Sequence, residues 1–352
     1  MASPGSIGVG MVGYGLAGRL FHAPYIEAVE GLRLAVIAPS NRDRQAQATA
    51  EHPEARVVPT VDDLLASRDV EMVVVATPNR SHVPIGIRAL EAGRHVVVDK
   101  PVAMDVPEAE TLLEAAERSG RILSVYQNRR WDGDFLTVRS LLENGVLGEI
   151  DSLEARFERW GVVGDVWREA ADEAGGPHRD LGAHLVDQSL VLFGGARRVF
   201  AQMDRRRHGS QVEDSVFVAI HHTDGVRSRL WTSLIAAHTA PRLRIRGLGG
   251  EYVKDDLDPQ EVQLLGGMRP NDPGFGEEPR GRWGRIHASD GTVRVVPTER
   301  GDYRWFYEGF RDAVWGVGRR PVDPLDSVRG LRVLEAAERS ARTGAVETVS
   351  EA

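Results

Sequence analysis

One lysine stands where it could act on a bound substrate. Lys100 follows the β-prone run 96–98, within the tripeptide Asp99-Lys100-Pro101. Open parallel α/β sheets bind their ligands outside the carboxyl ends of the strands, so a lysine at that edge can stabilise negative charge that develops on a substrate oxygen. An ordinary solvent-exposed lysine is the alternative interpretation.

A carboxylate and an imidazole are spaced for one face of a helix. Asp180 and His184 are four residues apart and Asp187 follows three residues later, in a stretch for which we predict a helix over 181–192. Three interpretations stay open: a catalytic pair, the start of a metal site, or a buried helix cap with a satisfied histidine. Because the ordinary pKa of histidine is the nearest to neutrality, His184 is the candidate general base.

A glycine-rich turn near the N-terminus indicates a nucleotide site. The apolar run 7–12 leads directly into the G-x-G-x-x-G pattern formed by Gly13, Tyr14, Gly15, Leu16, Ala17 and Gly18. The glycines permit a tight turn and a close approach of the backbone to a pyrophosphate, and the N-terminus of the following helix supplies N–H groups. The sequence therefore predicts a dinucleotide-binding site here.

The end of the second predicted strand bears on the choice of cofactor. NAD sites usually carry Asp or Glu about 20 residues beyond the glycine motif, to bind the ribose hydroxyls. This chain has Ala38-Pro39-Ser40-Asn41-Arg42 instead, and its next carboxylate is Asp43. Because Ser40 and Arg42 can donate hydrogen bonds to a 2′-phosphate, we predict NADP, with NAD as the alternative, and assign Ser40, Asn41 and Arg42 to its binding.

The first third of the chain alternates between β-rich runs and amphipathic stretches. The strand candidates are 7–12, 32–37, 72–76, 95–98 and 122–125, and a helix is expected over 107–119. This βαβ rhythm predicts a doubly wound parallel sheet, so the fold class is α/β, with a Rossmann domain over 1–125.

The pattern changes after residue 125. Helices are expected over 135–143, 181–192, 303–315 and 325–343, and alternating runs at 152–159, 199–203, 215–221, 228–235 and 243–246 predict a mostly antiparallel open sheet. We expect residues 126–352 to form an α+β domain for substrate binding and oligomerisation. The stretch 266–284, rich in Gly, Pro and charge, is expected to be a surface loop, and a disordered excursion, a lid and a subunit contact all stay open.

Composition excludes several classes of function. At 352 residues the chain exceeds one ordinary core, and a formal charge of −8 disfavours binding to nucleic acid. The absence of cysteine excludes thiolate catalysis and disulfides and fits a reducing cytosol. Residues 1–7 lack a basic segment with a long apolar run, and no stretch of 18 apolar residues occurs, so we expect a cytoplasmic protein without a membrane partner.

Together these motifs resemble the Gfo/Idh/MocA oxidoreductases, the group of glucose-fructose oxidoreductase and inositol dehydrogenase. The matching residues are Gly13 to Gly18, Thr77-Pro78-Asn79 with His82, Asp99-Lys100-Pro101 in place of the family's Glu-Lys-Pro, and Asp180 with His184. The resemblance covers nearly the whole chain. It implies NAD(P)-dependent transfer of hydride between nicotinamide and a secondary alcohol of a cyclic polyol or sugar.

A closer resemblance is to the branch that holds NADP-dependent scyllo-inositol dehydrogenases. It is carried by Phe21-His22-Ala23-Pro24, Asn128-Arg129-Arg130-Trp131-Asp132, Phe135-Leu136-Thr137, Tyr252-Val253-Lys254 and Asp258-Pro259-Gln260-Glu261. Two departures are Asp99 where the family usually has Glu, and Gln127 where this branch often has His. Neither removes a catalytic group, although Gln127 could alter the polarity of the pocket.

The resemblance assigns roles to these residues. It implies that His184 is the base, that Lys100 stabilises the alkoxide, and that Asp180 orients the imidazole or a neighbouring hydroxyl. Further cofactor-binding residues would be Thr77, Pro78, Asn79, His82, Asp99, Lys100 and Pro101, and substrate-binding residues would be Asn128, Arg130, Trp131, Trp167 and Arg168. No metal is expected, and the chain is expected to form a homodimer or homotetramer.

Two other functions remain open on the sequence alone. The same fold could serve a non-catalytic sensor that binds NAD(P) and a sugar, although Lys100, Asp180 and His184 are all retained. The other is a redox-assisted enzyme that cleaves glycosides with tightly held NAD. Release of free sugar from a glycoside would identify it.

Overall fold

The computed structural model describes residues 5–161 and 169–350. Its chain packs into two compact units, one of 1–128, 264–273 and 303–328, the other of 129–263, 274–302 and 329–352. Two late segments thus pack with the N-terminal unit, and the units do not follow the order of the chain. Domain bounds at 1–125 and 126–352 stay a prediction.

A six-stranded parallel sheet forms the centre of the first unit, in the order β3-β2-β1-β4-β5-β6. Its strands are β1 (Ile7–Val12), β2 (Leu32–Ala38), β3 (Arg56–Val57), β4 (Met72–Val75), β5 (His95–Asp99) and β6 (Leu123–Tyr126). The middle strands are apolar along their whole length because helices cover both faces of such a sheet. The doubly wound α/β fold expected from the sequence is confirmed.

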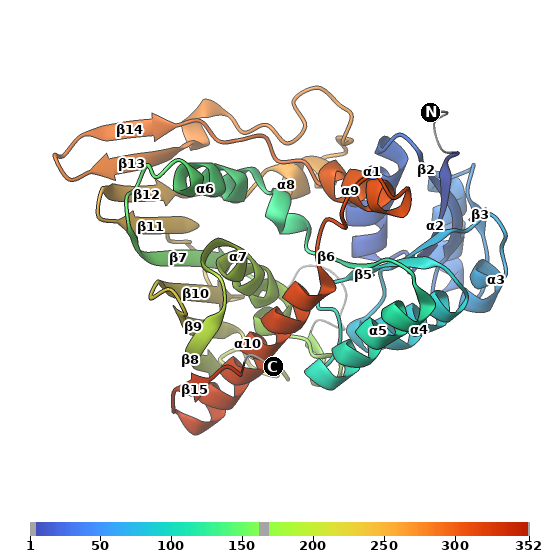
Figure 1. Ribbon diagram of the computed structural model, residues 1–352, viewed down its shortest axis with the longest axis horizontal. Coiled ribbons are helices and arrows are strands. Elements are labelled where there is room, and N and C mark those ends of the chain that lie inside the picture. Colours follow the sequence, from blue (N-terminus) through green and yellow to red (C-terminus); the bar gives the residue numbers. More distant parts are fainter. Residues whose placement is uncertain (1–4, 162–168, 351–352) are drawn as a thin grey trace. The chain divides into compact units, whose positions relative to one another are not determined.

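The helices of this unit begin and end at residues suited to their termini. They are α1 (Ala23–Ala28), α2 (Arg42–Glu51), α3 (Val61–Leu65), α4 (His82–Glu91), α5 (Val106–Ser119) and α9 (Arg304–Val314). Asp105 caps α5 by accepting a hydrogen bond from the backbone N–H of Glu108 at 2.9 Å, and the left-handed Gly120 ends it. Helices α4 and α5 pack side by side (Figure 1).

A nine-stranded mixed sheet forms the second unit, in the order β14-β13-β12-β11-β7-β10-β9-β8-β15. All neighbours are antiparallel except β7 and β10. The strands are β7 (Ile150–Glu158), β8 (Ala196–Asp204), β9 (Ser215–His222), β10 (Arg227–Ser233), β11 (Leu243–Gly247), β12 (Gly250–Lys254), β13 (Gly284–Ala288), β14 (Val293–Val296) and β15 (Glu347–Thr348). The mostly antiparallel sheet that the alternating runs predict is therefore confirmed.

The two faces of this sheet differ in composition. Along β7, Leu153, Ala155 and Phe157 are buried, whereas Glu154 and Arg156 point to the other face. The buried face packs against helix α7 (Ala183–Phe193). The other α-helices that begin after residue 128, apart from α9, are α6 (Gly133–Glu143), α8 (Gln260–Leu265) and α10 (Pro324–Thr343). Period-two burial is what a sheet with one covered face requires.

The stretch 266–284 is a packed loop over its second half, not a disordered excursion. Phe275 is buried, and the backbone N–H of Gly276 donates to Gln263 at 2.7 Å. Glu278 forms a buried ion pair with Lys254 at 2.9 Å. A buried charge is tolerated only when it is paired, so this contact fixes the loop to β12.

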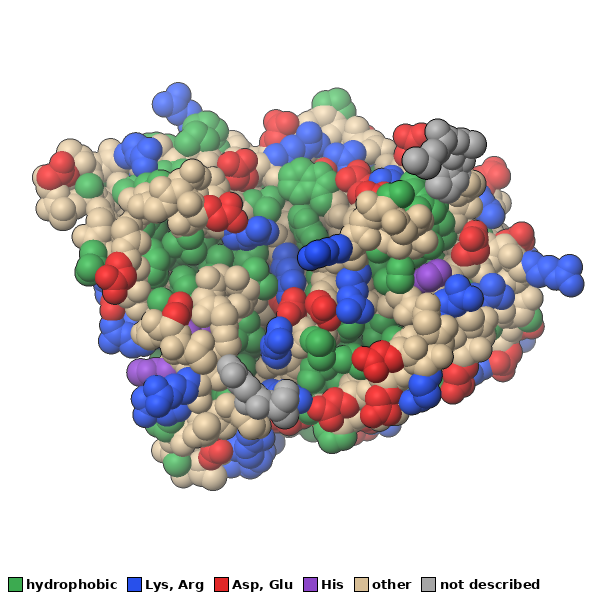
Figure 2. All heavy atoms as spheres, viewed as in Figure 1, with side chains coloured by type: hydrophobic (Ala, Val, Ile, Leu, Met, Phe, Trp, Pro, Cys, Tyr) green, Lys and Arg blue, Asp and Glu red, His purple; other side chains and the backbone are tan. Residues whose placement is uncertain are grey.

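The surface in view mixes both signs of charge. Figure 2 shows Lys and Arg side chains interspersed with Asp and Glu on the face that it draws. None of the helices within 5–161 and 169–350 has the length and apolar character needed to cross a bilayer.

Candidate active site

The turn after β1 can be formed only by glycine at two positions. Gly13 has a φ of +94°, and a Cβ there would lie 2.2 Å from the carbonyl oxygen of Ala76. A Cβ on Gly18 would lie 2.4 Å from the carbonyl oxygen of Gly13. Both distances are far below van der Waals contact, so the turn brings the start of the next helix against β1 and β4. This is the cradle that a pyrophosphate needs.

The helix that follows the glycine turn starts with an unusual segment. Residues Ala17–His22 form a π-helical stretch, η1, that continues into α1. The backbone N–H of Arg19 donates to the carbonyl of Gly15 at 3.0 Å, which closes the first turn. Leu16 and Ala17 are partly exposed at this N-terminus, where backbone N–H groups and the helix dipole favour an anion.

Tyr14 contributes its backbone to the turn and its side chain to packing. Its ring is buried, and its hydroxyl donates to the carboxylate of Glu51 in α2 at 2.5 Å. Burial, helped by the hydrogen bond and charge of Glu51, raises the pKa of the Tyr14 hydroxyl well above its usual range. The glycine turn is thereby tied to α2.

The loop after β2 presents donors and no acid before α2 begins. The Asn41 side chain caps α2 by accepting from the backbone N–H of Arg44 at 2.9 Å. Ser40 and Arg42 are exposed. Asp43 lies in the first turn of α2, where a carboxylate favours the helix dipole. Exposed donors beside the glycine turn fit a cofactor that carries a 2′-phosphate.

The loops after β4 and β5 are joined by a buried histidine. The ring of His82 lies with Nδ1 2.8 Å from the carbonyl oxygen of Pro101 and Nε2 2.9 Å from that of Thr77. Burial lowers the pKa of His82, although the charge of Asp99 opposes this shift. Both ring nitrogens face backbone carbonyls, so any contribution of His82 to a cofactor site runs through the two loops that it joins.

Polar atoms at this edge of the sheet fit a polar cofactor. The Thr77 hydroxyl and the Gln127 carbonyl oxygen are buried without a hydrogen-bond partner among the described residues, after β4 and β6 respectively. Asn79 is buried next to Thr77, whereas Pro78 is exposed. Buried polar groups ordinarily have partners, so the unpaired atoms indicate a place for polar groups of a ligand.

Lys100 stands at the end of β5 on a fixed backbone. The carboxylate of Asp99 accepts the backbone N–H of Lys100 at 2.8 Å, and the Lys100 side chain is partly exposed. Since β5 neighbours β4, and β4 neighbours β1, the lysine lies at the same sheet edge as the glycine turn. The sequence-predicted residues of the first unit are thus gathered at one edge.

Asp180 and His184 lie in consecutive turns of the second unit. Asp180 is in a second π-helical segment, η6 (His178–Gly182), which runs directly into α7. His184 is buried, with its ring 6.4 Å from that of Phe157 on β7 and the planes nearly parallel. Asp180 is partly exposed. A half-buried carboxylate one turn from a buried imidazole suits proton transfer.

The segment η6 is anchored by its other residues. Arg179 donates two hydrogen bonds to Glu338 of α10, at 2.6 and 3.0 Å. His178 lies with Nε2 3.0 Å from the carbonyl oxygen of Leu334, also in α10. Short π-helical segments often mark functional sites, and both segments that the structure describes here coincide with predicted site residues.

Asp187 forms an ion pair with Arg130. Arg130 donates two hydrogen bonds to it, from Nε to Oδ2 at 2.8 Å and from one terminal nitrogen to Oδ1 at 2.6 Å. Both carboxylate oxygens therefore face a guanidinium. Within the described ranges no three His, Asp or Glu side chains are gathered so as to hold a metal.

The residues that the resemblance assigns to substrate binding differ in how exposed their side chains are. Asn128 is buried and Trp131 is partly exposed, both in the short helix η3 (Asn128–Trp131) that follows β6. Arg130 is mostly buried through its contact with Asp187. Trp167 and Arg168 lie outside the described residues.

The contacts that hold η3 join residues far apart in the chain and were not predicted from the sequence. Asp258 accepts the backbone N–H of Gly133 at 2.7 Å, and Arg129 donates to Glu261 at 2.6 Å. Burial, with the nearby charge of Asp132, raises the pKa of Asp258 well above its usual range. The branch motifs around 128–132 and 258–261 thus meet in space. Their joint occurrence in the sequence was the available signal.

Comparisons with known proteins agree with this arrangement. Residues 7–127 match the oxidoreductase family with an NAD-binding Rossmann fold, and residues 135–253 match the Gfo/Idh/MocA C-terminal domain. The oxidoreductase YdgJ of Escherichia coli is 37% identical over 96% of this chain and 97% of its own. The NADP(+)-dependent scyllo-inositol 2-dehydrogenase IolW of Bacillus subtilis is 31% identical over 96% of this chain and 94% of its own.

A solved structure extends the similarity to the fold. The crystal structure of an oxidoreductase from Klebsiella pneumoniae superposes with a TM-score of 0.91 at 35% identity, covering 99% of this chain and 96% of that one. Both family models match this chain, and the glycine turn and the lysine after β5 lie within the first match. The chain is therefore a member of the Gfo/Idh/MocA family of oxidoreductases.

Proposed function

We propose that the protein transfers hydride between NADP(H) and a secondary alcohol of a cyclic polyol or sugar, as an inositol-dehydrogenase-like enzyme. The observation that carries the proposal is the placement of Lys100 at the same sheet edge as the glycine turn. The similarity to IolW, whose name states an NADP(+)-dependent scyllo-inositol dehydrogenase, supports the substrate class.

The cofactor would be held by the first unit. Its pyrophosphate would lie against the backbone of Gly13 to Gly18, and a 2′-phosphate would meet Ser40 and Arg42. The loop residues Thr77, Pro78, Asn79 and Asp99 to Pro101 would line the remainder, with Asn41 and His82 fixing their loops. When bound, the nicotinamide supplies the hydride acceptor or donor.

Side chains of the protein would accept the hydroxyl proton of the substrate and stabilise the negative charge on its oxygen. In the oxidation direction, His184 would accept the hydroxyl proton of the substrate at an imidazole nitrogen. Lys100 would stabilise negative charge on the same oxygen, and Asp180 would orient the imidazole or an adjacent hydroxyl. Polyol binding is assigned to Asn128, Trp131, Trp167 and Arg168, since donors and aromatic faces suit such a ligand. Arg130 would act by fixing η3 to α7.

The preference for NADP(H) can be tested at Arg42. Each hydrogen bond from a guanidinium to a 2′-phosphate contributes about 1.5–3 kcal/mol, so Arg42→Ala should lower kcat/KM for NADP about 10- to 100-fold. The value for NAD should change little. A matched control is Arg118→Ala, another exposed arginine of the same unit, on α5 and outside the residues assigned to the cofactor. A wild type that prefers NAD, or an unchanged NADP value in Arg42→Ala, would contradict the assignment.

The activity itself is tested with a panel of inositols, pyranoses and glycosides, each with NAD and NADP. We expect reduced cofactor to form with at least one cyclic polyol or sugar, together with the corresponding ketone. Tight binding of cofactor and sugar with no turnover in either direction would favour a sensor. Release of free sugar from a glycoside would favour a glycoside-cleaving enzyme.

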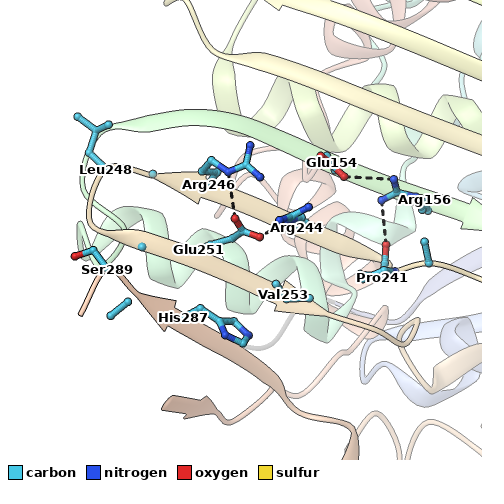
Figure 3. Close-up of a pocket in the computed structure, with 14 residues that line it drawn as sticks. Glu154, Arg156, Pro241, Arg244, Arg246, Leu248, Glu251, Val253, His287 and Ser289 are labelled. Atoms are coloured by element: carbon cyan, nitrogen blue, oxygen red, sulfur yellow. Dashed lines mark hydrogen bonds and ion pairs between the residues drawn. The ribbon is translucent and has the colours of Figure 1, made fainter. Parts of the chain in front are cut away.

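We also propose that the open face of the second sheet joins two copies of the chain. Figure 3 shows this face around β7, β11 and β12, where a depression of about 770 Å³ is lined by Arg244, Arg246 and Glu251 among others. Nearby, the guanidinium of Arg156 lies 3.9 Å from the ring centre of Trp231, which contacts Phe217. Arginine and glutamate alternate across the face, so an identical surface is complementary to it in a two-fold dimer.

A further inference from the structure

A buried histidine lies beneath the Lys100 turn. His22, at the end of η1, is fully buried, with its ring 4.3 Å from that of Tyr126. Its Nδ1 is 2.5 Å from the hydroxyl oxygen of Tyr307 in α9. Within 5–161 and 169–350, its Nε2 has no hydrogen-bond partner, but it faces the carboxylate of Asp99, with Oδ2 3.7 Å away.

Tyr307 and Asp99 together set the direction of these contacts. Burial, together with the charge of Asp99, raises the pKa of the Tyr307 hydroxyl well above its usual range, so it keeps its proton and can either donate or accept a hydrogen bond. The Asp99 carboxylate faces Nε2 and favours the ring proton on that nitrogen. Nδ1 is then the acceptor of the Tyr307 O–H.

The carboxylate of Asp99 is the group that His22 faces. Burial alone would raise the pKa of this carboxyl, but interaction with His22 and the positive charge of Lys100 outweigh it, and the pKa lies below its usual range. The other carboxylate oxygen accepts the backbone N–H of Lys100. Since His82 holds the carbonyl of Pro101, buried histidines secure both residues that flank Lys100.

We propose that His22 and Tyr307 are positioning residues for Lys100, which they hold through the ionised Asp99 at the edge of the sheet. The inference rests on the proposed function for its catalytic consequence, since Lys100 is there assigned to the substrate oxygen. Tyr307 orients the imidazole, the imidazole keeps Asp99 charged, and Asp99 fixes the backbone of Lys100.

Packing alone gives no reason for this arrangement. A buried imidazole nitrogen without a hydrogen bond costs free energy, and an apolar ring of similar size would avoid that cost. Tyr126 offers the comparison, because its ring also packs on His22, whereas its hydroxyl donates to the carbonyl of Phe21 at 2.6 Å. The Tyr126 hydroxyl thus bonds to the backbone, whereas the Tyr307 hydroxyl bonds to the imidazole of His22.

The first experiment compares Tyr307→Phe with Tyr126→Phe. Each removes one buried hydroxyl from a ring that contacts His22. With the polyol and cofactor that give the fastest turnover, Tyr307→Phe should lower kcat about 10-fold. The pKa of the Asp99 carboxyl, followed by its ¹³C chemical shift as the pH is changed, should move upward by about one pH unit, because Asp99 is less well held as the anion. Cofactor Kd should stay within about two-fold of wild type.

The control defines what would overturn the inference. Tyr126→Phe should keep the wild-type titration of Asp99 even if its thermal stability falls. If the two variants shift the pKa of Asp99 equally, or if neither shifts it, His22 and Tyr307 have no positioning role. His22→Gln should reproduce the shift, and Asp99→Glu, which keeps the charge, should retain more activity than Asp99→Asn.

The second experiment needs no turnover. In protein labelled with ¹⁵N at histidine, two-bond correlations report which ring nitrogens carry protons, and the spectrum of His22→Gln identifies the His22 signals. A proton on Nε2 in wild type supports the inference, and a bare Nε2 overturns it. If no polyol or sugar is turned over, the proposed function fails, while the tautomer of His22 still decides this arrangement.

Discussion

Lys100 and His184 carry the chemical part of the proposed reaction, and each offers a simple test. Lys100→Met removes the charge that would stabilise the alkoxide, and His184→Ala removes the base. We expect each to lower kcat about 100-fold or more. Cofactor Kd, measured by fluorescence titration, should change far less than kcat, because the pyrophosphate is assigned to the glycine turn and Lys100 is only one of several residues assigned to line the remainder. Near-normal turnover in both variants would contradict the mechanism.

Individual residues show where sequence reasoning stops. The types of Asp180, His184 and Asp187 indicated a polar helix face, but spacing could not say that Arg130 occupies both oxygens of Asp187. That contact joins residues far apart in the chain. Likewise, the sequence shows His22 only as part of a motif, because its partner Tyr307 is 285 residues away.

The regular elements were largely predictable because local patterns determine them. Helix α5 follows from Asp105, Pro107 and Gly120 at positions that start and stop a helix. The parallel, doubly wound character of the first sheet follows from the βαβ rhythm, whereas the two-residue edge strand β3 is too short to leave a pattern and was not predicted. The π-helical segments η1 and η6 carry no such local signal, since they depend on packing against other elements.

The contact between η6 and α10 predicts a pH-dependent effect on stability. Burial alone would raise the pKa of Glu338, but the hydrogen bonds and charge of Arg179 outweigh it and lower the pKa. The stabilisation is therefore present above the ordinary pKa of glutamate, about 4.3, and is lost as the pH falls through the lowered value. Glu338→Gln should reduce the free energy of unfolding at neutral pH by about 1.5 kcal/mol.

Denaturant unfolding at pH 7 and at acidic pH measures this effect. The difference between wild type and Glu338→Gln should shrink as the pH falls through the lowered pKa of Glu338. The control is Glu114→Gln, which removes an exposed pair with Arg118 and should change stability by less than about 0.5 kcal/mol. A pH-independent loss in Glu338→Gln would show that packing, and not the ion pair, holds η6.

The proposed dimer is tested at the open sheet face. Trp231→Glu places an acid among rings that a second copy would cover, so we expect the variant to be monomeric in sedimentation velocity while wild type is a dimer or tetramer. Trp305→Glu, at a tryptophan 43% exposed on α9, should leave assembly unchanged. A monomeric wild type, or a Trp231→Glu variant that assembles normally, would rule out this interface.

Transfer of label from substrate to cofactor tests the central claim most directly. A cyclic polyol that gives turnover in the panel is prepared with deuterium on its carbinol carbons, and the reduced cofactor formed by wild type is analysed by mass spectrometry. The account predicts a reduced nicotinamide that carries one deuterium, since hydride comes from the C–H of the oxidised alcohol. Reduced cofactor without deuterium would contradict it.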